Sequence, residues 1–107
     1  PMKAIIQGFR YDTDKARLIG EAESEVARLS PQYWSAGLYV TPRSGRYFLA
    51  GEGHEMSVFS KLRGRHDWSE GEAIIPLEDR EAAFNWAQQH LPVEVVEAEF
   101  DDMIEDA

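Results

Sequence analysis

Three histidines, His54, His66 and His90, are the side chains of this sequence best suited to acid–base or metal chemistry. None stands in the His-Glu-x-x-His spacing that places two zinc ligands on one helix face. His66 precedes Asp67 in a polar stretch, and His54 follows a glycine at the expected end of a strand. We therefore expect solvated or capping histidines, no bound metal and no cofactor.

Two other catalytic patterns are incomplete or missing. The run Gly51-Glu52-Gly53 lacks the third glycine and the lysine of a phosphate-binding loop, and its carboxylate would repel a phosphate. The sequence has no Gly-x-Ser-x-Gly elbow and no cysteine, which excludes disulfides, thiolate catalysis and cysteine metal sites. It thus predicts a binding protein and not an enzyme. The enzymatic alternative is a small hydrolase or transferase that uses His54 or His66 with a carboxylate.

The carboxylates are distributed unevenly along the chain. Residues 1–80 contain 12 Asp and Glu beside 11 Lys and Arg, whereas residues 81–107 contain 8 Asp and Glu and no Lys or Arg. The last quarter therefore carries nearly all of the net charge of −9. Such asymmetry indicates a partner selected by electrostatics, and it argues against direct binding of nucleic acid through this end.

Residues 93–106 have the period of an amphipathic helix. The apolar stripe consists of Val93, Val96, Phe100, Met103 and Ile104. The opposite face carries Glu94, Glu97, Asp101 and Glu105, flanked by Glu99, Asp102 and Asp106. Like charges at these spacings, and acids in the last turn, each weaken a helix by a few tenths to about 1 kcal/mol.

A helix selected for stability alone would not combine these features. We interpret Glu94, Glu97, Asp101, Asp102 and Glu105 as a partner-binding surface that imitates a nucleic-acid backbone. The alternative is an ordinary solvated face that enhances solubility.

Trp68 is the aromatic residue that we expect to anchor an interface, because its neighbours in sequence are polar. Basic residues offer an alternative contact surface. Arg43 and Arg46 flank an expected hairpin tip, and a second group precedes His66: Lys61, Arg63 and Arg65.

The elements that position these residues point to a single α+β domain over residues 1–107. Its clearest feature is a hairpin of strands 35–41 and 46–50, joined by Pro42-Arg43-Ser44-Gly45. Alternation along these strands places Leu38, Val40, Tyr47 and Leu49 on the core face, and Tyr39 and Phe48 on the other face. Other expected strands are 3–9, 21–26 and 73–77, the last at a sheet edge because of Pro76. Short helical segments are expected at 11–18 and 56–62, and two C-terminal helices at 78–90 and 93–106. Together they predict a small, mostly antiparallel sheet packed by helices.

The first residues of the chain and its hydropathy bear on its cellular location. Pro1 before Met2 has the form of a residue left by tag cleavage, so we expect the natural chain to start at Met2. No apolar run approaches the roughly 20 residues of a membrane span, and we expect a cytoplasmic protein.

Several motifs resemble those of a group of short, uncharacterised proteins of phages and mobile elements. The resemblance covers residues 11 to about 90 and contains no catalytic residues. Its motifs are Tyr11-Asp12-Thr13 with Ala16, Leu38-Tyr39-x-Thr41, Gly45-Arg46-Tyr47-Phe48-Leu49-x-Gly51-Glu52-Gly53, and Ile74-Ile75-Pro76-Leu77 with Glu81-Ala82 and Trp86.

That genomic setting includes anti-CRISPR proteins, which bind Cas effectors and block nucleic-acid loading or target recognition. The resemblance implies an inhibitor, monomeric or homodimeric, that binds an effector complex such as Cascade in the host cytoplasm. The acidic residues 93–106 lie outside the matched region, so mimicry of DNA does not follow from the resemblance. The alternative function is a regulatory or antitoxin-like module that binds a basic protein without imitating DNA.

Overall fold

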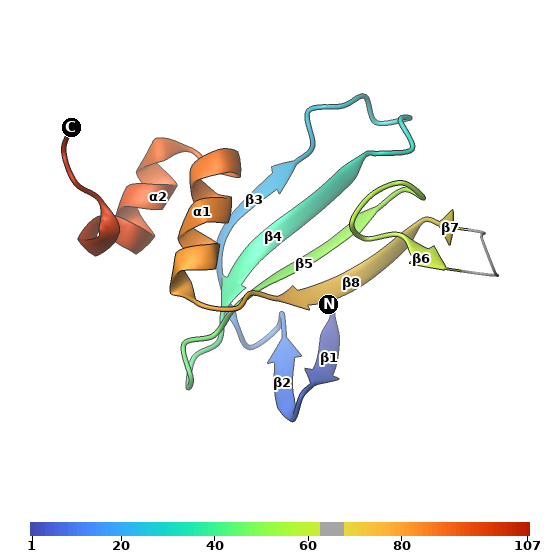
Figure 1. Cartoon of the computed structure of the whole chain (residues 1–107). Helices are drawn as coiled ribbons and strands as arrows, with labels where there is room; N and C mark the ends of the chain where they lie inside the picture. The colour runs from blue at the N-terminus through green and yellow to red at the C-terminus, as the bar shows by residue number, and fades with distance from the viewer. Residues whose placement is uncertain (63–67) are drawn as a thin grey trace.

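The computed structural model, which describes residues 1–62 and 68–107, confirms the α+β class. A four-stranded antiparallel sheet has the order β3-β4-β5-β8 (Figure 1). Its strands are β3 (Arg17–Glu23), β4 (Trp34–Val40), β5 (Tyr47–Gly53) and β8 (Gly71–Pro76). The remaining elements are the strand pairs β1 (Lys3–Ile6) with β2 (Phe9–Asp12) and β6 (Lys61–Leu62) with β7 (Trp68–Ser69), the helices α1 (Arg80–His90) and α2 (Val93–Phe100), and the 3-10 helix Asp101–Met103.

The hairpin of β4 and β5 confirms the strongest local prediction. The backbone N–H of Thr41 donates to the carbonyl of Arg46 at 2.9 Å and closes the loop. Strand β5 does not end at Ala50, as predicted, but continues to Gly53. Gly51 does not end the strand; it allows the backbones of β4 and β5 to lie close together at this point. A Cβ at Gly51 would lie 2.5 Å from the carbonyl oxygen of Ser35.

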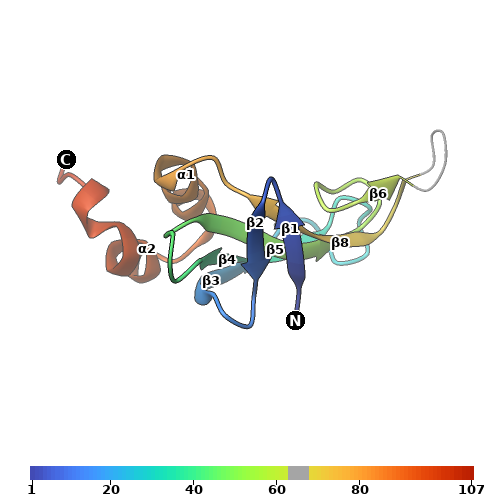
Figure 2. The same cartoon turned by 90° about the horizontal axis from the view of Figure 1, so that it is seen from below.

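Both faces of the sheet are covered over part of their area, and the alternation of β4 and β5 assigns residues to each face. As predicted, Leu38, Val40, Tyr47 and Leu49 share one face, where they pack against α1 and α2 through Ala83, Ala87, Val96 and Phe100. Tyr39 and Phe48 point to the other face, where Tyr11 of the β1–β2 hairpin packs on Phe48 with ring centroids 5.2 Å apart. Figure 2 shows this hairpin crossing the sheet.

Three local predictions from the N-terminal and middle segments are wrong. The expected strand 3–9 is interrupted by a tight turn in which both Gln7 (φ 51°) and Gly8 (φ 83°) have positive φ, so β2 starts at Phe9. Residues 11–18 form no helix, because Tyr11 belongs to β2 and Arg17 already belongs to β3. Residues 56–60 form turns and not a helix. Phe59 is only 1% exposed and packs near Trp34 of β4, which holds this segment against the sheet.

Both predicted C-terminal helices are present, but the second is shorter than predicted. The side chain of Asp79 accepts from Ala82 N–H at 2.8 Å and caps α1. Helix α2 ends at Phe100, and the chain leaves helical geometry after Met103. Adjacent carboxylates Asp101 and Asp102 at the negative end of the helix dipole explain why the predicted helix 93–106 does not continue.

The molecule is elongated, with extents of 46 × 33 × 20 Å. Helices α1 and α2 lie at one end of the sheet, and β6 and β7 lie at the other (Figure 1). Among the helices that the structure describes, none is long and apolar enough to cross a membrane.

Candidate functional site

The predicted acidic surface separates into carboxylates that face solvent and carboxylates that hold α2 to the sheet. Glu94, Glu97 and Asp101 are exposed, and their carboxylates have no hydrogen bond or ion pair within residues 1–62 and 68–107. We call these three residues the α2 acidic surface. Glu105 is also exposed, but it lies in the terminal segment beyond the 3-10 helix and does not continue the helical row.

Glu99 lies on the inner side of α2 and joins three elements. Its carboxylate accepts two hydrogen bonds from Arg17 of β3, at 2.7 and 3.1 Å. It also accepts one from the hydroxyl of Tyr47 of β5, at 2.9 Å. The side chain of Glu99 is only 13% exposed, so these bonds fix the face that α2 presents to the sheet.

Arg80, at the start of α1, supplies the cation that the sequence of the last helix lacks. Its guanidinium donates to both carboxylate oxygens of Asp102, at 2.6 and 2.7 Å. It also donates to the backbone carbonyl of Glu99, at 2.9 Å, and so satisfies a free carbonyl near the end of α2. Asp102 is therefore paired within the chain, and we exclude it from the α2 acidic surface.

The network shifts the titration of two carboxyl groups. Partial burial raises the pKa of Glu99, but the hydrogen bonds from Arg17 and Tyr47 outweigh this effect and hold the pKa below its usual value. The hydrogen bonds from Arg80 lower the pKa of Asp102. Both groups are thus ionised at neutral pH and stabilise the docked C-terminal segment.

Glu99→Gln is expected to reduce the free energy of unfolding by about 1–3 kcal/mol at pH 7, because the charge-assisted bonds from Arg17 are lost. Since the folded-state pKa of Glu99 is lowered, its contribution is fully present above the unfolded pKa of about 4.3 and is lost as pH falls through the folded value. Urea denaturation of both proteins at pH 7 and pH 3 measures this. The matched control is Glu97→Gln, expected within about 0.5 kcal/mol of the parent. Equal losses for Glu99→Gln at the two pH values would contradict the assignment.

Trp68 is exposed, as predicted, at 56%. It lies in β7 at the end of the sheet opposite α2, so the structure does not bring it next to the acidic surface (Figure 1). Other exposed apolar side chains come from two nearby loops, which a 2.8 Å hydrogen bond from Met56 N–H to the Pro31 carbonyl joins. These side chains are Leu29, Met56 and Val58.

Among the described residues, the predicted basic side chains lie at two separate places on the molecule. Arg46 stacks on Phe9, with its guanidinium carbon 3.6 Å from the ring centroid, near the β4–β5 turn. Lys61 lies in β6, at the other end of the sheet in both views (Figures 1 and 2). Arg63 and Arg65 lie outside the described residues.

The two histidines that the structure describes contact a backbone carbonyl and aromatic rings. A ring nitrogen of His54 lies 2.8 Å from the carbonyl oxygen of Ser30, and His90 packs against Trp34 and Trp86. His66 lies outside the described residues. In the part of the chain that the structure covers, no three His, Asp or Glu side chains are grouped as metal ligands.

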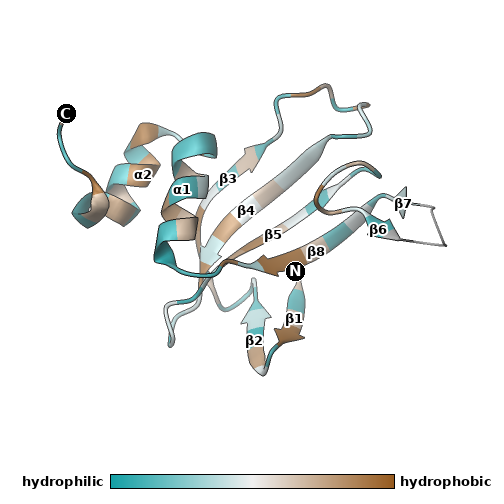
Figure 3. Ribbon diagram, viewed as in Figure 1, coloured by the Kyte–Doolittle hydropathy of each residue, from teal (hydrophilic) through white to brown (hydrophobic). Residues whose placement is uncertain are grey.

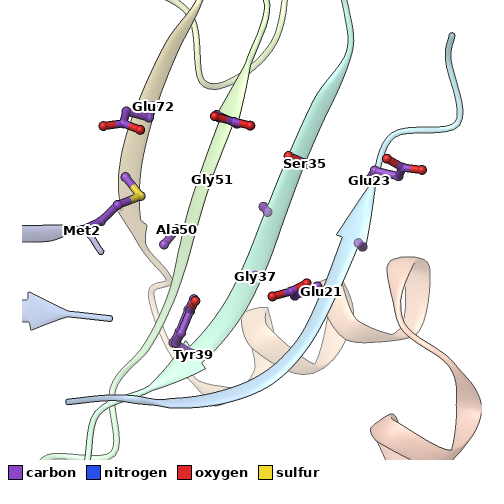
Figure 4. Close-up of a pocket in the computed structure, with 12 residues that line it drawn as sticks. Met2, Glu21, Glu23, Ser35, Gly37, Tyr39, Ala50, Gly51 and Glu72 are labelled. Carbon is purple, nitrogen blue, oxygen red and sulfur yellow. The ribbon is translucent and has the colours of Figure 1, made fainter. Parts of the chain in front are cut away.

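A second acidic surface, which sequence reasoning missed, lies on the sheet face opposite α2. Four residues in register form a row across β3, β4, β5 and β8: Glu23, Ser35, Glu52 and Glu72. Glu21 lies on the same face, beside an open depression of about 470 Å³ (Figure 4). Figure 3 shows that β8 is hydrophilic at its start and hydrophobic toward its end, where the β1–β2 hairpin covers it.

The sequence contained part of the signal for this second surface. The alternation of Glu21 and Glu23 places both on one strand face. Glu52 and Glu72 come together because β5 pairs with β8. The sequence does not show this pairing directly, since the short strands β6 and β7 lie between β5 and β8 in the chain. We call Glu21, Glu23, Glu52 and Glu72 the sheet acidic surface.

Comparison with known proteins adds no family assignment. No protein-family model matches the chain, and no curated protein or solved structure is significantly similar to it.

Proposed function

We propose that this protein is an anti-CRISPR-type inhibitor, which binds a Cas effector complex such as Cascade and blocks its recognition of DNA. The α2 acidic surface would occupy a basic site that otherwise reads DNA or its protospacer-adjacent motif. The observation that carries the proposal is the division of the C-terminal carboxylates. Glu99 and Asp102 hold the segment in place, and Glu94, Glu97 and Asp101 remain exposed and unpaired within the described residues.

The spacing of these carboxylates supports the proposal. Residues three or four apart on a helix are separated by about 4.5–6 Å along its axis. One strand of DNA presents a phosphate about every 3.4 Å of its axis. A rigid row of carboxylates at a comparable spacing can release counterions from a basic groove and be steered toward it, as DNA is.

The exposed apolar side chains favour a protein as the partner. Leu29 is 95% exposed, and Met56, Val58 and Trp68 are each more than half exposed. Apolar and aromatic side chains of this kind supply most of the affinity at protein interfaces, whereas carboxylates supply orientation and association rate. An inhibitor of this type would act in the host cytoplasm, as a monomer or a homodimer, without catalysis.

The sheet acidic surface favours a second candidate function, a regulatory or antitoxin-like module that binds a basic protein. Such a module would use the open sheet face and have no relation to a DNA-binding site. The two functions differ in which carboxylates matter and in whether DNA competes.

Affinity capture from nuclease-treated host lysate tests the proposal. We expect the tagged protein to retain a nucleic-acid-binding complex, and excess duplex DNA to release it. The bait with Glu94→Lys, Glu97→Lys and Asp101→Lys should retain none of that complex. Retention of the same complex by both baits, with no release by DNA, would exclude the α2 acidic surface as the binding site.

A further inference from the structure

A basic depression lies between the β2–β3 turn and the β4–β5 turn. It has a volume of about 450 Å³, and three cationic side chains line it: Arg10, Lys15 and Arg43. All three are exposed, and within the described residues none of their charged groups has an ion-pair partner. Unpaired cations gathered at one place are unexpected in a protein whose net charge is −9.

The two chain segments that form the depression are rich in basic residues. Residues 3–16 and 41–46 together contain five Lys and Arg and only two Asp, whereas the chain as a whole has 20 Asp and Glu. The two loops that form the depression therefore carry net positive charge, which attracts anions.

One acidic residue, Asp12, also lines the depression, but its hydrogen bonds stabilise the β2–β3 turn. It is only 8% exposed, accepts from the backbone N–H of Asp14 at 2.9 Å, and lies 3.9 Å from the ammonium group of Lys3. Its own backbone carbonyl accepts from Lys15 and Ala16, at 3.1 and 3.0 Å. Asp12 thus orders the loop that carries Lys15, and its charge is balanced by Lys3.

The opposite wall is equally well ordered. The hydroxyl of Thr41 accepts from the backbone N–H of Arg46 at 2.9 Å and lies 3.1 Å from the hydroxyl of Ser44. Gly45, with φ of 63°, permits the tight return of the chain. Arg43 is therefore carried by a loop that is already ordered, so that little backbone entropy is lost when it binds a ligand.

We propose that this depression binds a small organic phosphate of about the size of a nucleoside monophosphate. Two guanidinium groups, an ammonium group and the hydroxyls of Thr41 and Ser44 are the donors that phosphate oxygens prefer. Three basic residues along one depression suit a group with a charge near −2 better than a single carboxylate. The base or sugar of such a ligand would find apolar contacts on Pro42, Ala16 and the aliphatic parts of the basic side chains. The inference is independent of the proposed function.

Isothermal titration calorimetry with adenosine 5′-monophosphate tests this site. We expect a Kd of about 0.1–1 mM at low salt, weaker binding of inorganic phosphate, and no binding of adenosine. The double variant Arg10→Gln and Arg43→Gln should bind at least about tenfold more weakly, since two charge-assisted contacts are lost. The matched control, Arg28→Gln with Lys61→Gln, removes the same charge elsewhere and should leave the Kd unchanged.

Three outcomes would overturn the proposal. The first is the absence of binding at roughly 10 mM adenosine 5′-monophosphate, about ten times the weakest expected Kd. The second is an equal loss of affinity in the two double variants, which would indicate attraction by net charge alone. The third is binding of a short single-stranded oligonucleotide without binding of the mononucleotide. Urea denaturation of both variants verifies that they are folded, as expected for substitutions of exposed side chains.

Discussion

Replacing Glu94, Glu97 and Asp101 together with lysine is expected to reduce affinity for the captured complex by about 100-fold or more. Each substitution turns an attraction to a basic site into a repulsion, and like charges across an interface cost several kcal/mol. The fold should survive, because all three side chains are exposed and unpaired within the described residues. Lysine at position 101, the C-cap of α2, also interacts favourably with the helix dipole. Surface plasmon resonance, with urea denaturation as the folding test, measures both quantities.

The sheet acidic surface provides the matched control. Glu21→Lys with Glu52→Lys and Glu72→Lys changes the net charge by the same amount, on the opposite sheet face. These three side chains are also exposed. We expect this variant to bind the complex with little loss of affinity. The reverse result, binding lost only in this control variant, would favour the second candidate function and an interface on the sheet.

Phe100→Ala is expected to lower the free energy of unfolding by about 3–5 kcal/mol, as truncation of a fully buried aromatic side chain does. Phe100 is 0% exposed, and its ring lies 5.7 Å from that of Tyr47 and 5.5 Å from that of Phe84. The loss is a large part of the stability of a typical small domain. Urea denaturation at neutral pH measures it.

Val93→Ala is the control for this experiment, because Val93 belongs to the same predicted stripe but is 69% exposed. It should change the free energy of unfolding by less than about 0.5 kcal/mol. A loss below about 1 kcal/mol for Phe100→Ala would mean that α2 is not docked in solution. The acidic surface would then have no fixed geometry.

Local patterns were enough to predict the class of fold and its central hairpin. Alternation assigned Leu38, Val40, Tyr47 and Leu49 to one face, and the structure confirms it. The last helix was predicted too long because its period continues to Ile104, whereas the charge at its C-terminus disfavours further turns. The tight turn at Gln7 and Gly8 was missed because the run from Lys3 to Phe9 has a continuous strand-like composition.

The pairing of the carboxylates required three-dimensional information. Arg80 lies 22 residues before Asp102, and Arg17 lies 82 residues before Glu99. Neither cation lies within the acidic segment 93–106. Only the packing of α2 on β3 and α1 separates the carboxylates that stabilise the fold from those that are free to bind a partner.

Competition on one purified complex tests the central claim most directly. The captured and purified complex would be incubated with increasing concentrations of its target DNA, and its affinity for this protein would be measured at each concentration. If the α2 acidic surface takes the place of DNA, the apparent Kd rises in proportion to the DNA concentration above its own Kd, and no ternary complex forms. An unchanged Kd, with protein and DNA bound to the complex together, would contradict the proposed mimicry.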